Sequence, residues 1–345
     1  MDFTALAQRI CNGKGQITKA ESLAVLNSRT EWWGIYGAAL MVKNHFYQNK
    51  LQLNVLMNAK SGLCAEDCGY CAQSKISSAD IETYGLLPTD IIYKKALLAY
   101  KRNATTFCIA TSGSRLSEQE MLAVGETIQK IKRDLPLEIC LSVGLSTLEQ
   151  INYFKSCGVD RLNHNLNTPQ DNYEKIATTH TYAQRKATLE MLQQVDMNAC
   201  AGFICGMGET DEQLIDLAFE LRDLTPHAVP INFLIPIVGT KFSNVHTLTP
   251  LKCLKILALM RFIFPETELR ASAGREYHLG DLQHFALLIT DSLFLGDYLT
   301  SGGDTENQDI AKLELLEIDY KRKERSNQAQ VIPEQRIYDR LSKLI

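Results

Sequence analysis

Short apolar runs alternate with longer amphipathic stretches from Leu53 onward. The runs are rich in β-branched and aromatic residues and have the length of strands. They cover residues 53–59, 105–111, 138–144, 161–167, 198–206, 229–237, 268–274 and 292–296. Strands and helices that alternate in this way predict an α/β fold, a parallel (β/α)8 barrel of the TIM type.

The stretches between the runs begin with helix-capping patterns. In a capping box, a Ser or Thr and a Glu or Gln three residues later satisfy free amides of the first turn. A Thr followed by Pro is a second kind of helix start. The patterns are Ser117…Glu120, Ser146…Glu149, Thr181…Gln184, Thr210…Gln213 and Thr249-Pro250. They support a helix between most neighbouring strands.

Three segments are expected along the chain. Residues 1–50 form a helical extension with an aromatic face around Trp32 and Trp33, which either caps the bottom of the barrel or supports a homodimer. Residues 51–303 form the barrel, which no Pro/Gly-rich linker divides. Residues 304–345 form a polar tail that ends in a short amphipathic helix.

Alternate positions of the runs share a chemical character. Side chains alternate across a strand, so these positions lie on one face. One face is apolar, as at Phe107 and Ile109, and should lie under helices. The other should point into the barrel, and it carries Cys108, Ser112, Cys140, Ser142, Asn163, Asn165, Asn167, Cys200, Asn232, Arg270 and Ser272.

An ordinary barrel of this type fills its interior with branched aliphatic residues. Unpaired buried polar groups cost about 1–3 kcal/mol each, so these side chains must meet each other, a cofactor or a substrate. The competing interpretation is a core of mutually satisfied polar groups with inert buried cysteines.

The overall charge is −4, from 36 Lys and Arg against 40 Asp and Glu. The basic run 321–325 has the pattern of a solvated helix face, so no nucleic-acid partner is expected. The N-terminus lacks a signal pattern, and the apolar segments 32–42 and 256–264 are too short to span a membrane. Ten cysteines in such a chain indicate a reducing cytoplasm and metal ligation rather than disulfides.

Cys64, Cys68 and Cys71 follow the first run in a C-x3-C-x2-C pattern. Three thiolates so close in sequence favour a soft metal. A structural zinc would need a fourth ligand, and the nearest candidates, His45 and Cys108, are distant in sequence. A four-iron cluster would leave one iron for a ligand that is not protein. The alternative is a buried helix face, although the intervening residues extend no apolar stripe.

Cys108, Cys140 and Cys200 point into the predicted barrel from three different strands, which suggests a second iron–sulfur cluster. Arg270 shares their face. Because a guanidinium is normally a permanent cation, its chemistry alone indicates an electrostatic partner of an anionic cluster.

The three-cysteine motif resembles that of the radical S-adenosylmethionine (SAM) enzymes, and the chain from about Leu53 to Gly302 resembles the biotin synthase family among them. The matching positions are Cys64/Cys68/Cys71, Phe107-Cys108, Cys140, Asn163-His164-Asn165, Thr178-Thr179, Thr181-Tyr182, Arg185, Cys200, Pro230-Ile231-Asn232 and Arg270 with Ser272 to Glu276. The resemblance implies that Cys64, Cys68 and Cys71 hold a 4Fe-4S cluster. It also implies that Cys108, Cys140, Cys200 and Arg270 hold a 2Fe-2S cluster, with Arg270 a true ligand.

The implied activity converts dethiobiotin to biotin. SAM bound to the open iron would be cleaved to a 5′-deoxyadenosyl radical, which removes hydrogen from two unactivated carbons. Sulfur from the 2Fe-2S cluster then bridges them, in a sulfurtransferase reaction. The family implies a flavodoxin or ferredoxin as the electron donor.

The resemblance also assigns binding positions. SAM contacts are implied at Tyr70, Ser112, Asn165, Asn167, Arg185, Gly202, Ile204 and Glu209. Substrate contacts are implied at Asn163, Asn165, Asn232, Thr300 and Ser301, since amides suit the donors and acceptors of a ureido ring.

Two positions depart from the family pattern. Asn167 stands where an aspartate is common, so a charged contact to the SAM ribose becomes neutral, and Thr300-Ser301 matches loosely a pair of threonines that takes the substrate carboxylate. The remaining cysteines are interpreted as core or surface thiols: Cys11, Cys157, Cys205 and Cys253.

Two other functions stay open. One alternative is another radical SAM enzyme on the same barrel, such as one resembling the hydrogenase-maturation or methylornithine enzymes, and finding only one cluster per chain would favour it. A non-enzymatic iron–sulfur carrier would need neither a polar barrel interior nor a SAM site.

Overall fold

The computed structural model describes residues 1–321. One parallel sheet in the order β5-β4-β3-β2-β1-β9-β8-β7-β6 closes on itself through a β5–β7 pairing. The strands are β1 (Gln52–Lys60), β2 (Thr106–Thr111), β3 (Glu138–Ser142), β4 (Arg161–Asn163), β5 (Asn198–Cys200), β6 (Phe203–Cys205), β7 (Ala228–Phe233), β8 (Glu268–Ala271) and β9 (Ser292–Phe294). The predicted (β/α)8 barrel is confirmed.

One predicted strand is interrupted. Residues 198–206 form β5 and β6, which break at Gly202. Opposite the break lies Pro230 of β7, which has no amide hydrogen to give to a neighbouring strand. A Cβ on Gly202 would lie 1.9 Å from the Pro230 carbonyl oxygen, so only glycine fits. The two short strands together take the place of one of the eight strands of the barrel.

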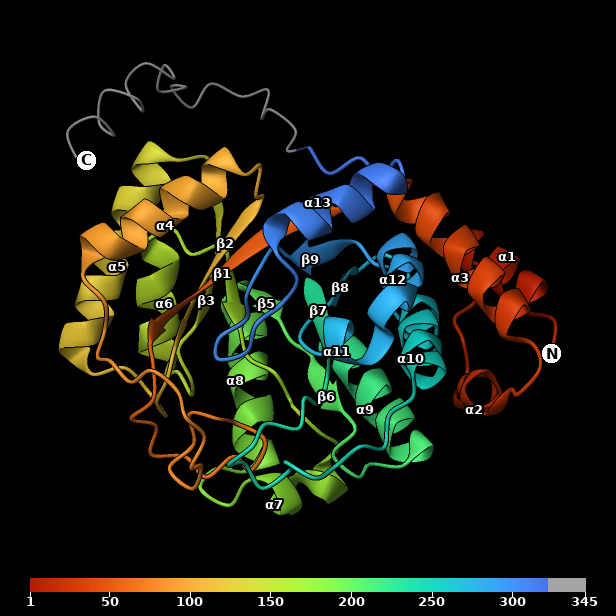
Figure 1. The fold of residues 1–345 in the computed structure, drawn as a ribbon, viewed down its shortest axis with the longest axis horizontal. Helices are drawn as coiled ribbons and strands as arrows, with labels where there is room; N and C mark the ends of the chain where they lie inside the picture. The colour runs from red at the N-terminus through yellow and green to blue at the C-terminus, as the bar shows by residue number, and fades with distance from the viewer. Residues whose placement is uncertain (322–345) are drawn as a thin grey trace.

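Helices surround the sheet (Figure 1). The longer ones that cover it are α4 (Thr89–Lys101), α5 (Glu118–Asp134), α6 (Leu148–Ser156), α8 (Tyr182–Gln194), α9 (Asp211–Asp223) and α10 (Pro250–Ile263). The shorter ones are α7 (Tyr173–Ile176), α11 (Arg275–Leu279), α12 (Gln283–Ile289) and the 3-10 turns η1 (Gln170–Asn172) and η2 (Gly280–Leu282). Their buried apolar faces and the outer face of the sheet form one continuous core.

The predicted caps are confirmed at Ser117, Thr181, Thr210 and Thr249. The expected box Ser146…Glu149 is wrong by one residue. Thr147 caps α6. Its hydroxyl accepts from the Gln150 amide, and the Gln150 side-chain oxygen accepts from the Thr147 amide. Two overlapping boxes fit the sequence there, and the chain uses the second.

The N-terminal extension contains α1 (Phe3–Cys11), α2 (Lys19–Asn27) and α3 (Trp32–Tyr47). It lies outside the barrel, where α3 packs against α10 and α12, and α2 against α9 and α10 (Figure 1). The aromatic face is used there, because the rings of Trp33 and Tyr36 both contact Phe285 edge to face. The extension therefore lies along the outer helices rather than across the bottom of the barrel.

The described chain ends with α13 (Glu306–Leu315), which Thr305 caps, and with a bridge between Lys50 and Asp319. The rest of the predicted tail and most of the basic run 321–325 lie outside the described residues. Within residues 1–321 no helix has the length and apolar character needed to cross a membrane.

Candidate active site

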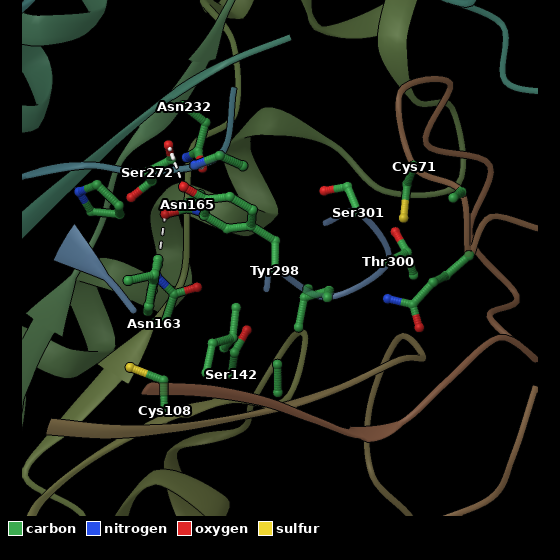
Figure 2. A pocket seen from close by; sticks show the side chains of 18 of the residues that line it. Cys71, Cys108, Ser142, Asn163, Asn165, Asn232, Ser272, Tyr298, Thr300 and Ser301 are labelled. Carbon is green, nitrogen blue, oxygen red and sulfur yellow. Dashed lines mark hydrogen bonds between the residues drawn. The ribbon is translucent and has the colours of Figure 1, made fainter. Parts of the chain in front are cut away.

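A cavity of about 240 Å³ occupies the interior of the barrel. The polar positions predicted to point inward line much of its wall: Cys108, Cys140, Ser142, Asn163, Asn165, Asn232, Arg270 and Ser272. Loop residues close it, with Tyr70, Cys71 and Gln73 after β1 and Tyr298, Thr300 and Ser301 after β9. In Figure 2 the three asparagines stand on one side, and Cys71, Thr300 and Ser301 stand on the other.

Three buried thiols meet at the inner end of this cavity. Cys108 and Cys140 are register partners on β2 and β3, and they cluster with Cys200 of β5. The Cys108 thiol raises the pKa of Cys140, and the Cys140 thiol together with burial raises the pKa of Cys200. Unligated Cys140 and Cys200 therefore hold their protons and would release them on binding a metal.

Arg270 of β8 joins the thiols from the opposite side of the barrel. Its Nε donates to Ser292 Oγ at 3.0 Å and its Nη2 to Glu268 Oε1 at 2.7 Å. Its Nη1 faces the thiols, 3.9 Å from Cys200 Sγ. The guanidinium is 1% exposed and lies over the Phe294 ring. The side chain is thus fixed with one nitrogen directed at the thiol cluster.

Glu268 connects Arg270 to a second buried arginine, Arg161. It accepts from Arg270, from Ser292 Oγ at 2.6 Å and from Arg161, which also pairs with Glu138 at 2.8 Å. Burial favours the neutral acid, but Arg270 and Arg161 outweigh it and hold the pKa of Glu268 below its usual range. Burial also opposes the charge on Arg270, yet Glu268 raises its pKa above the usual value. Glu268 and Arg270 are both ionised.

Cys64, Cys68 and Cys71 lie on the irregular loop after β1, which excludes the helix-face alternative. Burial, with the neighbouring thiols, raises the pKa of Cys68 to about 12, and burial raises that of Cys71 to about 11. Within residues 1–321 no three His, Cys, Asp or Glu side chains lie close enough to bind a single metal ion. A 4Fe-4S cluster would instead take each thiolate on a different iron, and these three thiols suit such a cluster.

The residues expected to contact SAM form a connected group beside this loop. Asn165 accepts from the Arg185 Nε through its carbonyl and from the Gly202 amide through Oδ1, at 2.9 Å in the second case. The Asn167 carbonyl accepts from the Ile204 amide at 2.8 Å, and Asn167 itself has a left-handed φ of 71°. These bonds bring the end of β4 against the start of β6.

Three further SAM candidates differ in their surroundings. Tyr70 lines the cavity. The Ser112 hydroxyl is buried without a partner among the described residues, as expected for a group that awaits a ligand. Glu209 is occupied locally, since its carboxylate accepts from the amides of Gly206 and Met207, and burial raises its pKa.

The substrate candidates are held by the backbone. The Asn163 amide donates to Cys200 O at 3.1 Å, and the Asn232 amide donates to Phe203 O at 3.1 Å and accepts from Ala273 N at 3.3 Å. Tyr298 was missed from the sequence, yet it lines the cavity with its hydroxyl on Glu276. It lies on the loop after β9, where no periodic pattern shows which side chains turn inward.

Two domain models match most of the chain. One described as the Radical SAM superfamily covers residues 60–221, and one described as the Biotin and Thiamin Synthesis associated domain covers residues 230–319. A biotin synthase of Streptococcus agalactiae serotype III (strain NEM316) is 50% identical over 323 residues, which are 94% of this chain and 98% of the relative.

The chain belongs to the biotin synthase family. A family member from Halalkalibacterium halodurans is 41% identical over 310 residues, 90% of this chain and 93% of the relative. Membership makes the chain a radical SAM enzyme of the sulfurtransferase class, whose cofactors are a 4Fe-4S cluster, SAM and a 2Fe-2S cluster. It decides against a non-enzymatic carrier.

Solved structures share the fold of this biotin synthase family member. The crystal structure of methylornithine synthase has a TM-score of 0.81 at 19% identity and covers 92% of this chain and 97% of its own. The FeFe-hydrogenase maturase HydG from Carboxydothermus hydrogenoformans has a TM-score of 0.78 at 16% identity, with 92% and 78% covered. At these identities the likeness shows the barrel and not the reaction.

Proposed function

We propose that this chain converts dethiobiotin to biotin with Cys64, Cys68 and Cys71 as the ligands of the 4Fe-4S cluster. Cys108, Cys140, Cys200 and Arg270 are the ligands of the 2Fe-2S cluster in this proposal. The observation that carries it is the meeting of three buried thiols and Arg270 Nη1 at the inner end of a cavity whose other end reaches Cys71.

When bound, the 4Fe-4S cluster and SAM supply a carbon-centred oxidant, and the 2Fe-2S cluster supplies sulfur. The polypeptide binds and orients the substrate and the cofactors, and it excludes water. Leu56 and Phe294 contribute apolar wall between the thiols and the loops, so a reactive group in the cavity meets little solvent.

Asn163, Asn165 and Asn232 suit the ureido ring of dethiobiotin. Their amides line one side of the cavity, and hydrogen bonds to the backbone and to each other limit their rotation. A cyclic urea offers both N–H donors and a carbonyl acceptor, which amides match. A ring held here lies close to the thiols, because Asn163 Nδ2 is 3.4 Å from Cys200 Sγ.

Thr300 and Ser301 face these amides across the cavity (Figure 2). Their hydroxyls suit the carboxylate at the end of the substrate chain. SAM binds where the end of β4 meets the start of β6. The hydrogen bonds that hold this site together involve Asn165, Asn167, Arg185, Gly202 and Ile204. Tyr70, Ser112 and Glu209 lie at its edge.

The electron donor is a flavodoxin or ferredoxin, the enzyme is a homodimer, and it acts in the cytoplasm. Support for the compartment comes from the ten cysteines, which are free wherever the structure describes them, as a reducing environment requires.

The test is anaerobic reconstitution of the full chain with iron and sulfide, followed by spectroscopy and by an assay with dithionite, SAM and dethiobiotin. The expected result is two distinct cluster signals, together with formation of biotin and 5′-deoxyadenosine. One cluster per chain in a preparation that still makes biotin would overturn the assignment of the inner thiols.

A further inference from the structure

Cys68 has a histidine neighbour that the cofactor assignments leave without a role. His180 Nε2 lies 3.2 Å from Cys68 Sγ. His180 precedes α8 and is 5% exposed, although it is separated from Cys68 by 112 residues. Two sets of contacts hold the imidazole nitrogen and the thiol together in this partly buried position.

The first set is made by Asp67, which joins the two loops. Its carboxylate accepts from the amides of Thr178 and Thr179 at 2.8 and 3.1 Å, and from both of their hydroxyls. Its own amide donates to Thr179 Oγ1 at 3.1 Å, and the next amide but one, Gly69, donates to Ile176 O at 2.7 Å. Because Asp67 immediately precedes Cys68 and Thr179 immediately precedes His180, these bonds fix the two side chains against each other.

The second set is made by Tyr173 of α7, which lies beside the loop after β1 (Figure 1). Its hydroxyl is 2.9 Å from His180 Nδ1, and its ring contacts the imidazole. A thiolate that ligates iron carries no proton, so the Cys68 contact is favourable only if Nε2 carries the hydrogen. Nδ1 then accepts, and the Tyr173 hydroxyl is the donor placed to satisfy it.

We propose that His180 is a positioning residue that donates its Nε2–H to the Cys68 thiolate and makes the 4Fe-4S cluster easier to reduce. The inference rests on the proposed function, because it takes Cys68 as a cluster ligand. Reduction adds negative charge to the cluster, and a hydrogen bond to a ligating sulfur stabilises that charge. Tyr173 holds the imidazole in the tautomer that makes this bond.

The chain of contacts also reaches the proposed SAM site. Burial raises the pKa of the Tyr173 hydroxyl, and the neighbouring side chains of Arg185 and Asn167 oppose this shift. The same side chains are thus placed between the cofactor-binding strand ends and the ligand loop. This arrangement gives His180 fixed partners on both ring nitrogens, which a structural histidine at the edge of a core does not require.

The test is the midpoint potential of the 4Fe-4S cluster, measured by redox titration and electron paramagnetic resonance on the reconstituted full chain without substrate. His180→Leu removes the donor and is expected to move the potential to a more negative value at unchanged iron content. His180→Gln keeps an N–H and is expected to retain most of the parental potential. His45→Leu, on the exposed face of α3, is the matched control and should change nothing.

A parental potential in a fully loaded His180→Leu enzyme would overturn the proposal, as would equal shifts in the Leu and Gln variants. If neither variant assembles the cluster, the parental enzyme labelled with ¹⁵N-histidine decides. Spin-echo spectroscopy should then detect a histidine nitrogen coupled to the reduced cluster, and no coupling overturns the proposal. Assembly of an intact 4Fe-4S cluster in Cys68→Ser would instead contradict the assignment of Cys68 as a cluster ligand.

Discussion

The guanidinium of Arg270 lies against the thiol of Cys200, with Nη1 3.9 Å from Sγ. The two residues are 70 positions apart, on β8 and β5, and both are buried. Ser292 and Glu268 hold the other two nitrogens of the guanidinium, so its orientation toward the thiols is imposed by the strands around it. The proposed fourth ligand of the 2Fe-2S cluster is therefore held in one orientation by the protein itself.

Glu268→Gln should destabilise the barrel, because it leaves Arg270 and Arg161 buried without their shared carboxylate. Removing one partner from a buried ion pair costs about 3–5 kcal/mol. Thermal and denaturant unfolding of the metal-free chain should show this loss. Glu138→Gln is the matched control, because Glu138 is more exposed and contacts Arg161 alone of the two arginines, so its effect should be smaller.

The Glu268 ion pairs also predict a pH dependence. The pKa of Glu268 is lower in the folded chain than its ordinary value of 4.5. Its contribution to stability is therefore complete above pH 4.5 and declines as the pH falls through the folded pKa. The difference in unfolding free energy between the parental chain and Glu268→Gln should shrink as the pH is lowered below about 4.5. A difference that grows toward acid pH would contradict the assignment.

Gly202→Ala should disrupt the closure of the barrel. The added Cβ would lie 1.9 Å from the Pro230 carbonyl oxygen, and backbone must move to relieve the clash. Overpacking of this kind costs about 3 kcal/mol, which should appear as a lower melting temperature. Gly37→Ala is the control: it meets nothing within 4 Å on the exposed face of α3, where alanine stabilises a helix by up to about 1 kcal/mol.

The hydroxyls of Thr300 and Ser301 should recognise the substrate carboxylate. Hydrogen bonds to a charged group contribute about 1.5–3 kcal/mol, so the double variant Thr300→Val/Ser301→Ala should bind dethiobiotin about ten- to a hundredfold more weakly. Dethiobiotin methyl ester supplies the control, measured by calorimetry. The parental enzyme should lose affinity for the ester, while the double variant should bind acid and ester alike. Equal discrimination by both enzymes would place the carboxylate elsewhere.

Much of this architecture was predictable because the alternation of side chains along a strand is strict. The parity that placed Phe107 outward and Cys108 inward carried over to β3, β7 and β8. Prediction failed where tertiary contacts override local pattern. The break at Gly202 depends on Pro230, 28 residues later, and the regular part of β4 ends at Asn163 although the chain runs on beside Gly202.

Loops were the harder part of the site. Tyr298 and His180 belong to irregular segments, where no period fixes the direction of a side chain. Their positions depend on partners distant in sequence, Glu276 for the first and Cys68 for the second. A single sequence contains no local signal for such pairs.

The central claim is that the 2Fe-2S cluster held by the inner thiols supplies the sulfur, while the 4Fe-4S cluster held by the outer thiols supports SAM cleavage. Cys140→Ser separates the two functions, with Cys157→Ser as the control at a buried cysteine away from the cavity. The reconstituted Cys140→Ser enzyme should form 5′-deoxyadenosine from SAM and dethiobiotin but no biotin, whereas Cys68→Ser should form neither. Biotin formation by Cys140→Ser at the parental rate would contradict the account.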